Sequence, residues 1–326
     1  MRNSGKYLAC VKSEARRFHI TRNFLTLDVA MTPKTDKKPR VIELTPRRDQ
    51  ASKPAELIQI TGHQVLTLNA RRAITILWHN AHLQGIKEGK DYAIEIDDLK
   101  PDDHKGYEMV EEAIVALMQA ILTVKLSNGK TRRVQFLGGN DIDDPDRPAG
   151  VLTYSFDKRL IEILEDSTIW GKIALPVIMA FSSKYSVSLY ENAAQWAGLQ
   201  KKTFQDFTLE DFRALLGVED AKYSAFGALN KHVIKPAVQE VNALAPFSVT
   251  VMPVKTGKRV SHIRIGWWAK SKEEADAAWR EVNRAKIGRK ARISGLADHV
   301  AHPYPSQNRM LRDTRKDLRS LKPSND

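Results

Sequence analysis

The spacing of apolar residues changes from a helical to a strand-like period twice along this chain, in the same order each time. Between Val65 and Leu83, apolar side chains recur every three or four residues, which predicts an amphipathic helix. The segment IEIDDLK follows with an Asp suited to capping, and the helical spacing returns from Tyr107 to Leu122. The pattern then becomes strand-like in VKLSNGKTRRVQFL, where Asn128-Gly129 indicates a hairpin turn.

The second half of the chain repeats this order. A helix is expected near Ile173 to Phe181, then SKYSVSLYENAAQW, then a short helix after Thr208, which forms a capping box with Asp211 in place of the usual Glu. A longer helix is predicted from Lys222 to Ala243, with a kink or boundary at Pro236 because proline removes a backbone hydrogen bond. The strand-like segments FSVTVMPV and VSHIRIGWW flank a KTGKR turn. Helices followed by a β-hairpin predict an α+β fold with two tandem winged-helix domains.

Charge divides the chain into four segments. The sequence holds 52 Lys and Arg against 39 Asp and Glu, a net charge of +13. The net charges are +8 for residues 1–55, −5 for 56–157, +5 for 158–270 and +5 for 271–326. The first segment mixes Pro, Lys, Arg and Ser, which predicts a basic, largely disordered arm. The middle segments are predicted to be the two winged helices, and the last a basic tail with a short helix from Lys272 to Lys286.

This excess of positive charge favours a polyanionic partner, because Lys and Arg that neutralise phosphates release condensed counterions. Nucleic acid is the leading partner, and an anionic membrane surface is the rival. The sequence has no run of about 18 apolar residues and no apolar signal-peptide centre, so we expect a cytoplasmic protein with no membrane partner. The only aromatic residue of the 272–286 helix is Trp279, which gives a membrane-binding helix little support. The single Cys10 has no second thiol for a disulfide or a metal site.

In a winged helix, the third helix usually enters the major groove while the hairpin contacts phosphate or the minor groove. In the second domain, small and basic residues lie opposite the apolar arc of the long helix, and its hairpin concentrates cations. The candidate DNA-binding residues of this domain are Lys222, Ser224, Lys231, His232, Lys235, Lys255, Lys258, Arg259 and Arg264. The alternative explanation is the charged, solvated face that any soluble helix has.

The first domain differs in charge. Its third helix carries Glu108, Glu111 and Glu112 near its start, where the helix dipole favours acids but DNA repels them, so strong base reading is not expected there. Its predicted hairpin adds three further candidates for phosphate contacts, Lys130, Arg132 and Arg133. An ordinary hairpin that avoids edge pairing by carrying charge is the alternative.

Catalytic and metal sites are not indicated. The chain has no His-x-His pair of the kind a rolling-circle initiator needs. His79 and His82 are three residues apart but lack further ligands, and the acidic loop of residues 141–150 lacks the Gly and bidentate Glu of a calcium loop. GIKEGK has the wrong glycine spacing for a phosphate loop. We therefore expect no catalytic residue, no metal, no cofactor and no enzymatic activity.

Two segments of the second half, SKYSVSLYE (183–191) and YSAFGALNKHVIKPAVQEVN (223–242), resemble the iteron-binding plasmid replication initiators, the RepA/RepE-like family of theta-replicating plasmids. The first carries a Tyr-Ser followed by Leu-Tyr-Glu, and the second ends in Pro-Ala and Glu-Val-Asn. One departure is that family members often carry several Arg on the long helix, where Asn230, Lys231 and His232 stand here.

The resemblance implies that the second winged helix reads repeated origin sites, called iterons, in double-stranded DNA, while the first mediates dimerisation and contacts the DNA backbone. It also implies a homodimer in equilibrium with a monomer, opening of the origin, repression of the protein's own promoter, and recruitment of the host initiator DnaA and the replicative helicase. The alternative is a winged-helix transcriptional repressor without a replication role, which would bind an inverted repeat.

Overall fold

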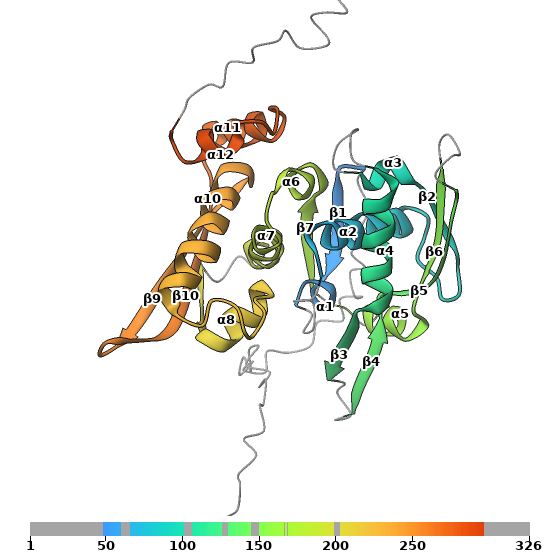
Figure 1. Cartoon of the computed structure of the whole chain (residues 1–326), viewed down its shortest axis with the longest axis horizontal. Helices are drawn as coiled ribbons and strands as arrows, with labels where there is room; N and C mark the ends of the chain where they lie inside the picture. Colours follow the sequence, from blue (N-terminus) through green and yellow to red (C-terminus); the bar gives the residue numbers. More distant parts are fainter. Residues whose placement is uncertain are drawn as a thin grey trace, which may run out of the picture. The chain divides into compact units, whose positions relative to one another are not determined.

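The computed structural model describes residues 48–59, 66–100, 106–125, 130–144, 150–165, 167, 169–198 and 203–296. All of them belong to one compact unit, within which two hydrophobic cores form. Each core lies inside one winged helix, so the predicted α+β fold with two tandem winged helices is confirmed (Figure 1).

The first winged helix combines three helices with a three-stranded sheet. Its elements are α2 (Leu68–Leu83), β2 (Tyr92–Glu95), α3 (Ile96–Leu99), α4 (Tyr107–Gln119), β5 (Leu137–Ile142) and β6 (Val151–Phe156). Thr67 begins α2 by accepting a hydrogen bond from the N–H of Ala70. Strand β6 lies in the middle of the sheet, antiparallel to both β2 and β5.

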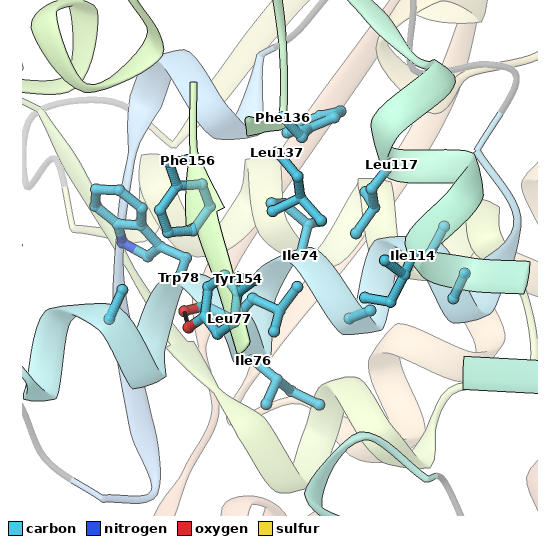
Figure 2. Close-up of a cluster of buried hydrophobic side chains, with 14 of the residues drawn as sticks. Ile74, Ile76, Leu77, Trp78, Ile114, Leu117, Phe136, Leu137, Tyr154 and Phe156 are labelled. Atoms are coloured by element: carbon cyan, nitrogen blue, oxygen red, sulfur yellow. Dashed lines mark hydrogen bonds between the residues drawn. The ribbon is translucent and has the colours of Figure 1, made fainter. Parts of the chain in front are cut away.

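Aromatic and aliphatic side chains fill the core of this half (Figure 2). Trp78 from α2 packs edge-on against Phe156 of β6, with ring centroids 5.7 Å apart. The hydroxyl of Tyr154, also on β6, donates a hydrogen bond of 2.6 Å to the carbonyl of Leu77. Because this hydroxyl is buried, displacing α2 from the sheet would leave a polar group unpaired, and the helix is therefore held in register on the sheet.

The hairpin that the sequence suggests as the first wing is a separate element. Strands β3 (Ile121–Lys125) and β4 (Thr131–Gln135) pair with each other and with no other described strand. The predicted turn at Asn128-Gly129 lies outside the described residues. The winged-helix sheet instead uses β5 and β6, so the wing of the first half is the acidic connection between them.

Burial explains which hairpin joins the sheet. Leu137 on β5 and Leu152 on β6 are completely buried against the helices of the first core. On β3 and β4, the buried side chains among those described are Leu122 and Val134, one on each strand. The β5–β6 pair therefore contributes far more apolar surface to the core, and this favours its place in the sheet.

The second winged helix has the same plan. Its elements are α7 (Lys184–Ala197), β8 (Phe204–Thr208), α8 (Leu209–Leu216), a long helix, β9 (Phe247–Thr256) and β10 (Arg259–Ala269). Thr208 caps α8 by accepting from the N–H of Asp211 at 3.0 Å, as the sequence predicts. The strand order β8-β10-β9 matches β2-β6-β5, with the third strand between the first two, so the predicted duplication of architecture is confirmed.

The long helix begins later than the sequence suggests. It consists of α9 (Phe226–Leu229), a π-helical turn η2 (Asn230–Ile234) and α10 (Lys235–Leu244). The expected start at Lys222 is wrong because Tyr223 has a φ of 54°, which a continuous right-handed helix does not allow. Arg213 holds this bend by donating to the carbonyls of Lys222 and Tyr223 at 2.6 and 2.9 Å.

The irregularity predicted at Pro236 is present as the π-helical turn. A proline lacks an N–H, and its ring clashes with the carbonyl four residues earlier, here that of His232. In η2 the N–H of Lys235 bonds to the carbonyl of Asn230, five residues back, which widens the turn just before Pro236. The helix therefore continues through the proline instead of breaking.

Residues assigned to the basic arm contribute to the folded unit. Strand β1 (Gln50–Pro54) pairs antiparallel with β7 (Trp170–Ala174), and α1 (Ala55–Ile58) follows it. The expected end of the arm at residue 55 is therefore wrong. Lys53 can be buried in β1 because its ammonium group donates to the carboxylate of Glu191 at 2.7 Å.

The boundary between the halves also differs from the expected one. Helix α5 (Lys158–Glu165) contributes Leu160 and Leu164 to the first core, which therefore extends beyond residue 157. The helix expected from Ile173 begins at the start of α6 (Leu175–Ala180), since residues 173–174 complete β7.

Part of the predicted basic tail is also folded. Helix α11 (Lys272–Val282) begins at a capping box formed by Ser271 and Glu274, and it ends four residues before the expected Lys286. A further helix, α12 (Arg289–Ile293), replaces the irregular segment expected there. Both helices contact α10, and the buried Arg289 joins them to the second winged helix. Residues 297–326 lie outside the described part of the chain.

Candidate nucleic-acid interface

The long helix of the second half presents a cationic ridge to solvent. Lys231, Lys235 and Gln239 are exposed and four residues apart, so they form one line along the helix. His232 is exposed beside them, whereas Leu229, Val233 and other apolar residues face the second core. Neither Lys231 nor Lys235 forms an ion pair with any described residue. The charges of both lysines are therefore available to an anionic partner.

The segment before the helix lies against the same ridge. The ring of Tyr223 stacks on His232, with centroids 5.7 Å apart and an interplanar angle of 20°. Lys222 and Ser224 are exposed in this segment, not on the helix as the sequence suggested. Lys222 donates to Glu219 at 2.9 Å, and this hydrogen bond raises the pKa of Lys222. Part of the charge of Lys222 is thus already neutralised within the chain.

The wing of the second half is a long antiparallel hairpin that extends from the body of the molecule (Figure 1). Gly257 supplies the positive φ of 62° that the turn requires, and Thr256 pairs with Arg259 across it. Lys255, Lys258 and Arg259 are exposed around this turn and form no ion pair with the described residues. The three predicted cations at the tip are therefore gathered at one end of the hairpin.

Arg264, also predicted to bind DNA, has partners within the chain. Its Nε and Nη2 donate to the two carboxylate oxygens of Asp206 on β8, each at 2.7 Å. Its guanidinium also lies over the ring of Phe204 at 4.3 Å from the centroid. The hydrogen bonds lower the pKa of Asp206 below its ordinary value. Arg264 thus joins β10 to β8, and its donors are less available to phosphate than those of Arg259.

The three basic candidates of the first half lie on the β3–β4 hairpin. Arg132 donates from Nη1 to the carboxylate of Glu162 on α5 at 2.7 Å, so its charge is paired. Lys130 and Arg133 are exposed on the same hairpin. These two are therefore the basic side chains of the hairpin best placed to meet a phosphate.

The elements of the first half that correspond to the cationic ridge and basic wing are acidic. Glu108, Glu111 and Glu112 are exposed on α4, and Asp141 and Asp144 are exposed on or beside β5. Partial burial and the nearby carboxylates of α4 and the wing raise the pKa of Tyr107, which shows that the two acidic elements lie close together. This face would repel a DNA backbone.

The histidine pair considered as a metal site is part of the folded interior of the first half. His79 is buried, with Nε2 3.2 Å from the carbonyl of Arg48, and His82 stacks on Trp170. Burial lowers the pKa of both imidazoles below the ordinary value of 6.5. Among the described residues, no group of three or more His, Cys, Asp or Glu side chains is arranged to hold a metal ion. The described helices also include none long and apolar enough to span a membrane.

Contacts between the two halves involve charged residues that sequence reasoning did not single out. Arg71 on α2 donates to the hydroxyl of Ser188 on α7. Arg72 donates to the carbonyls of Met179 and Phe181 at the end of α6. Burial lowers the pKa of Arg71 to about 10. A helical face with arginine at two successive buried positions is the one signal that pointed to these contacts.

Taken together, the fold and its charged surface define a tandem winged-helix protein with a cationic helix and wing in its second half. Two family models match: "Initiator Replication protein, WH1" over residues 50–194 and "Initiator Rep protein, WH2" over residues 208–267. The chain belongs to this family of initiator replication proteins. No curated protein sequence matches it closely enough to count as a relative.

Solved structures share the fold. The Pi initiator protein, crystallised in complex with iteron DNA, superposes with a TM-score of 0.52 at 19% identity, covering 69% of this chain and 99% of that one. A structure of domains 2 and 3 of RctB gives a TM-score of 0.40 at 11% identity, covering 63% of this chain and 81% of that one.

Proposed function

We propose that this chain initiates plasmid replication by binding iterons in double-stranded origin DNA through its second winged helix. The observation that carries this proposal is the unpaired cationic ridge of Lys231 and Lys235 on the third helix, in the same domain as the exposed basic tip of the wing. A helix of this kind reads base edges in the major groove, while the wing neutralises phosphates. Family membership supports the same reading.

Within this proposal the candidate residues have different tasks. Lys231, His232 and Lys235 face the groove, and Ser224 contacts the adjacent backbone. The wing cations at positions 255, 258 and 259 bind phosphate. Lys130 and Arg133 supply backbone contacts from the first half, and the remaining candidates, Lys222, Arg132 and Arg264, act mainly by holding the surface in shape through their internal partners.

The further steps of initiation are part of the same proposal. The monomer opens the origin and recruits DnaA and the replicative helicase, and a homodimer formed through the first winged helix represses the protein's own promoter. The resemblance to RepA/RepE-like initiators supports these steps. Sedimentation of the protein alone and on duplexes with one or several repeats tests the monomer–dimer part, and a single species of constant stoichiometry would contradict it.

The central experiment is a DNA titration by fluorescence anisotropy. The probes are duplexes with the tandem repeats that flank the gene or, if these are absent, duplexes selected from a random library. We expect cooperative binding to direct repeats. The double variant Lys231→Ala with Lys258→Ala should bind more weakly, and its slope of log K against log salt should fall by about 1.8, roughly 0.9 for each lost phosphate contact.

A matched control removes two exposed lysines elsewhere, Lys87→Ala with Lys172→Ala, which should leave affinity and slope unchanged. If both double variants bind like the wild type, the chosen face is wrong. If the wild type prefers an inverted repeat and ignores direct repeats, the protein is instead a transcriptional repressor.

A further inference from the structure

A cavity of about 570 Å³ lies where the C-terminal helices meet the rest of the molecule. Its walls come from the start of α2, the connection between α6 and α7, the exposed side of α10, and α12 with the residue Lys286 before it. The C-terminal helices follow residue 267, where the match to the second family model ends. The cavity is therefore built partly by a segment to which neither family model assigns a role.

The charged groups of the cavity are mostly cationic. Arg72, Lys286, Arg289 and Lys290 line it, and Glu240 is its one carboxylate. Glu240 is buried, and its Oε1 accepts a hydrogen bond of 2.6 Å from the N–H of Ser182. The lining thus carries an excess of three positive charges, which favours an anionic ligand.

Arg289 fixes this arrangement from inside. It is 6% exposed, and it donates from Nη1 to the carbonyl of Ala180 at 2.9 Å and from Nη2 to the carbonyl of Arg284 at 2.9 Å. Its buried Nε makes no hydrogen bond with the described residues and lies 3.5 Å from Oε1 of Glu281. Glu281 is shared with Arg292, which it contacts at 2.7 Å. Internal acids therefore occupy the arginines of α12, whereas the exposed Lys290 has no ion pair among the described residues.

The cavity adjoins the cationic ridge. Pro236 and Gln239 line it, and Gln239 lies one turn beyond Lys235 on the ridge. One helical turn advances about 5.4 Å, which is short compared with the major-groove width of about 12 Å. A duplex that receives Lys231 and Lys235 in its groove would therefore pass a strand of its backbone close to the cavity.

We propose that the C-terminal helices form a third DNA-contacting element, in which the cavity between α10 and α12 binds a backbone phosphate beside the groove. Lys290 supplies the main charge, and the buried Arg289 positions α12 against α10. The inference rests on the proposed function, since the ligand is the duplex held by the ridge. It extends the DNA-binding surface beyond the winged helix.

The test compares Lys290→Ala with Lys272→Ala, an exposed lysine of α11 outside the cavity. On the duplex that binds the wild type, Lys290→Ala should lower the slope of log K against log salt by about 0.9, the contribution of one phosphate. Lys272→Ala should leave it unchanged. Ethylation interference should lose one modified phosphate at the edge of the wild-type pattern with Lys290→Ala, and Lys290→Glu should weaken binding further.

Two outcomes would overturn the inference. In one, Lys290→Ala and Lys290→Glu both keep the wild-type slope and interference pattern. In the other, calorimetry without DNA shows that ATP binds the wild type but not Lys290→Glu, while DNA binding is equal in both, which would assign the cavity to a free nucleotide. A wild-type protein that binds no duplex at all would contradict the proposed function itself, so the two failures are distinguishable.

Discussion

The two winged helices of this protein share a strand order but carry opposite charge on corresponding elements. In the second half, the third helix exposes Lys231 and Lys235, and the wing exposes three further cations. In the first half, the third helix exposes Glu111 and Glu112, and the wing between β5 and β6 is acidic. The same architecture is therefore compatible with attracting a duplex or repelling it.

The difference shows that fold and binding are encoded on different faces of the same elements. Buried residues such as Leu117 on α4 and Val241 on α10 set how each helix packs on its sheet. The exposed residues between them make little contribution to that packing and are free to change sign. A winged helix alone is thus weak evidence for DNA binding, and the charge on its third helix decides the matter.

The two halves also depend on each other through a buried ion pair, which gives the largest effect that we predict. Glu191→Ala leaves the ammonium of Lys53 buried without its carboxylate, and breaking such a pair costs about 3–5 kcal/mol. Urea unfolding should show this loss in the free energy of unfolding. The double variant Lys53→Met with Glu191→Leu should recover most of it, because no buried charge remains. Wild-type stability of Glu191→Ala would mean that the halves are not joined by this pair.

A second prediction exchanges the signs of the two third helices. Lys231→Glu with Lys235→Glu should lower the affinity for the direct-repeat duplex on the order of 100-fold, since each lost contact is worth about 1–3 kcal/mol. Glu111→Lys with Glu112→Lys should not weaken binding and should raise the affinity for unrelated DNA. Both titrations use anisotropy at one salt concentration. Equal losses in the two variants would show that the halves share the work of binding.

The smallest effect is a pH dependence confined to the first half. His79 and His82 have pKa values below 6.5 in the folded protein, so the unfolded chain binds protons more readily. Their contribution to stability is complete above pH 6.5 and is lost as the pH falls through 6.5 towards the lowered values. Thermal unfolding followed by tryptophan fluorescence should report this decline. His82→Phe should reduce it, and a Tm that is constant across this range would contradict the prediction.

Several corrections share a physical cause. The first wing was assigned to the β3–β4 hairpin because Asn128-Gly129 is a strong local turn signal, yet membership of a sheet depends on apolar contacts with distant helices. Lys53 was placed in a disordered arm because its neighbours are polar, and its partner Glu191 is 138 residues away. The start of the long helix was placed at Lys222 because its spacing is helical, whereas Arg213 holds a bend there.

By itself, the sequence determined the two helix-to-hairpin series, the caps at Thr208 and Ser271, the irregularity at Pro236, and the position of charge along the chain, because these depend on residues near one another. Tertiary structure alone decided which hairpin completes the first sheet, how far the folded unit extends at each end, and which cations are already paired. Arg264 and Lys258 look equivalent in the sequence, but only Arg264 meets a carboxylate when β10 pairs with β8. Pairing between distant segments sets such contacts, and no local pattern records it.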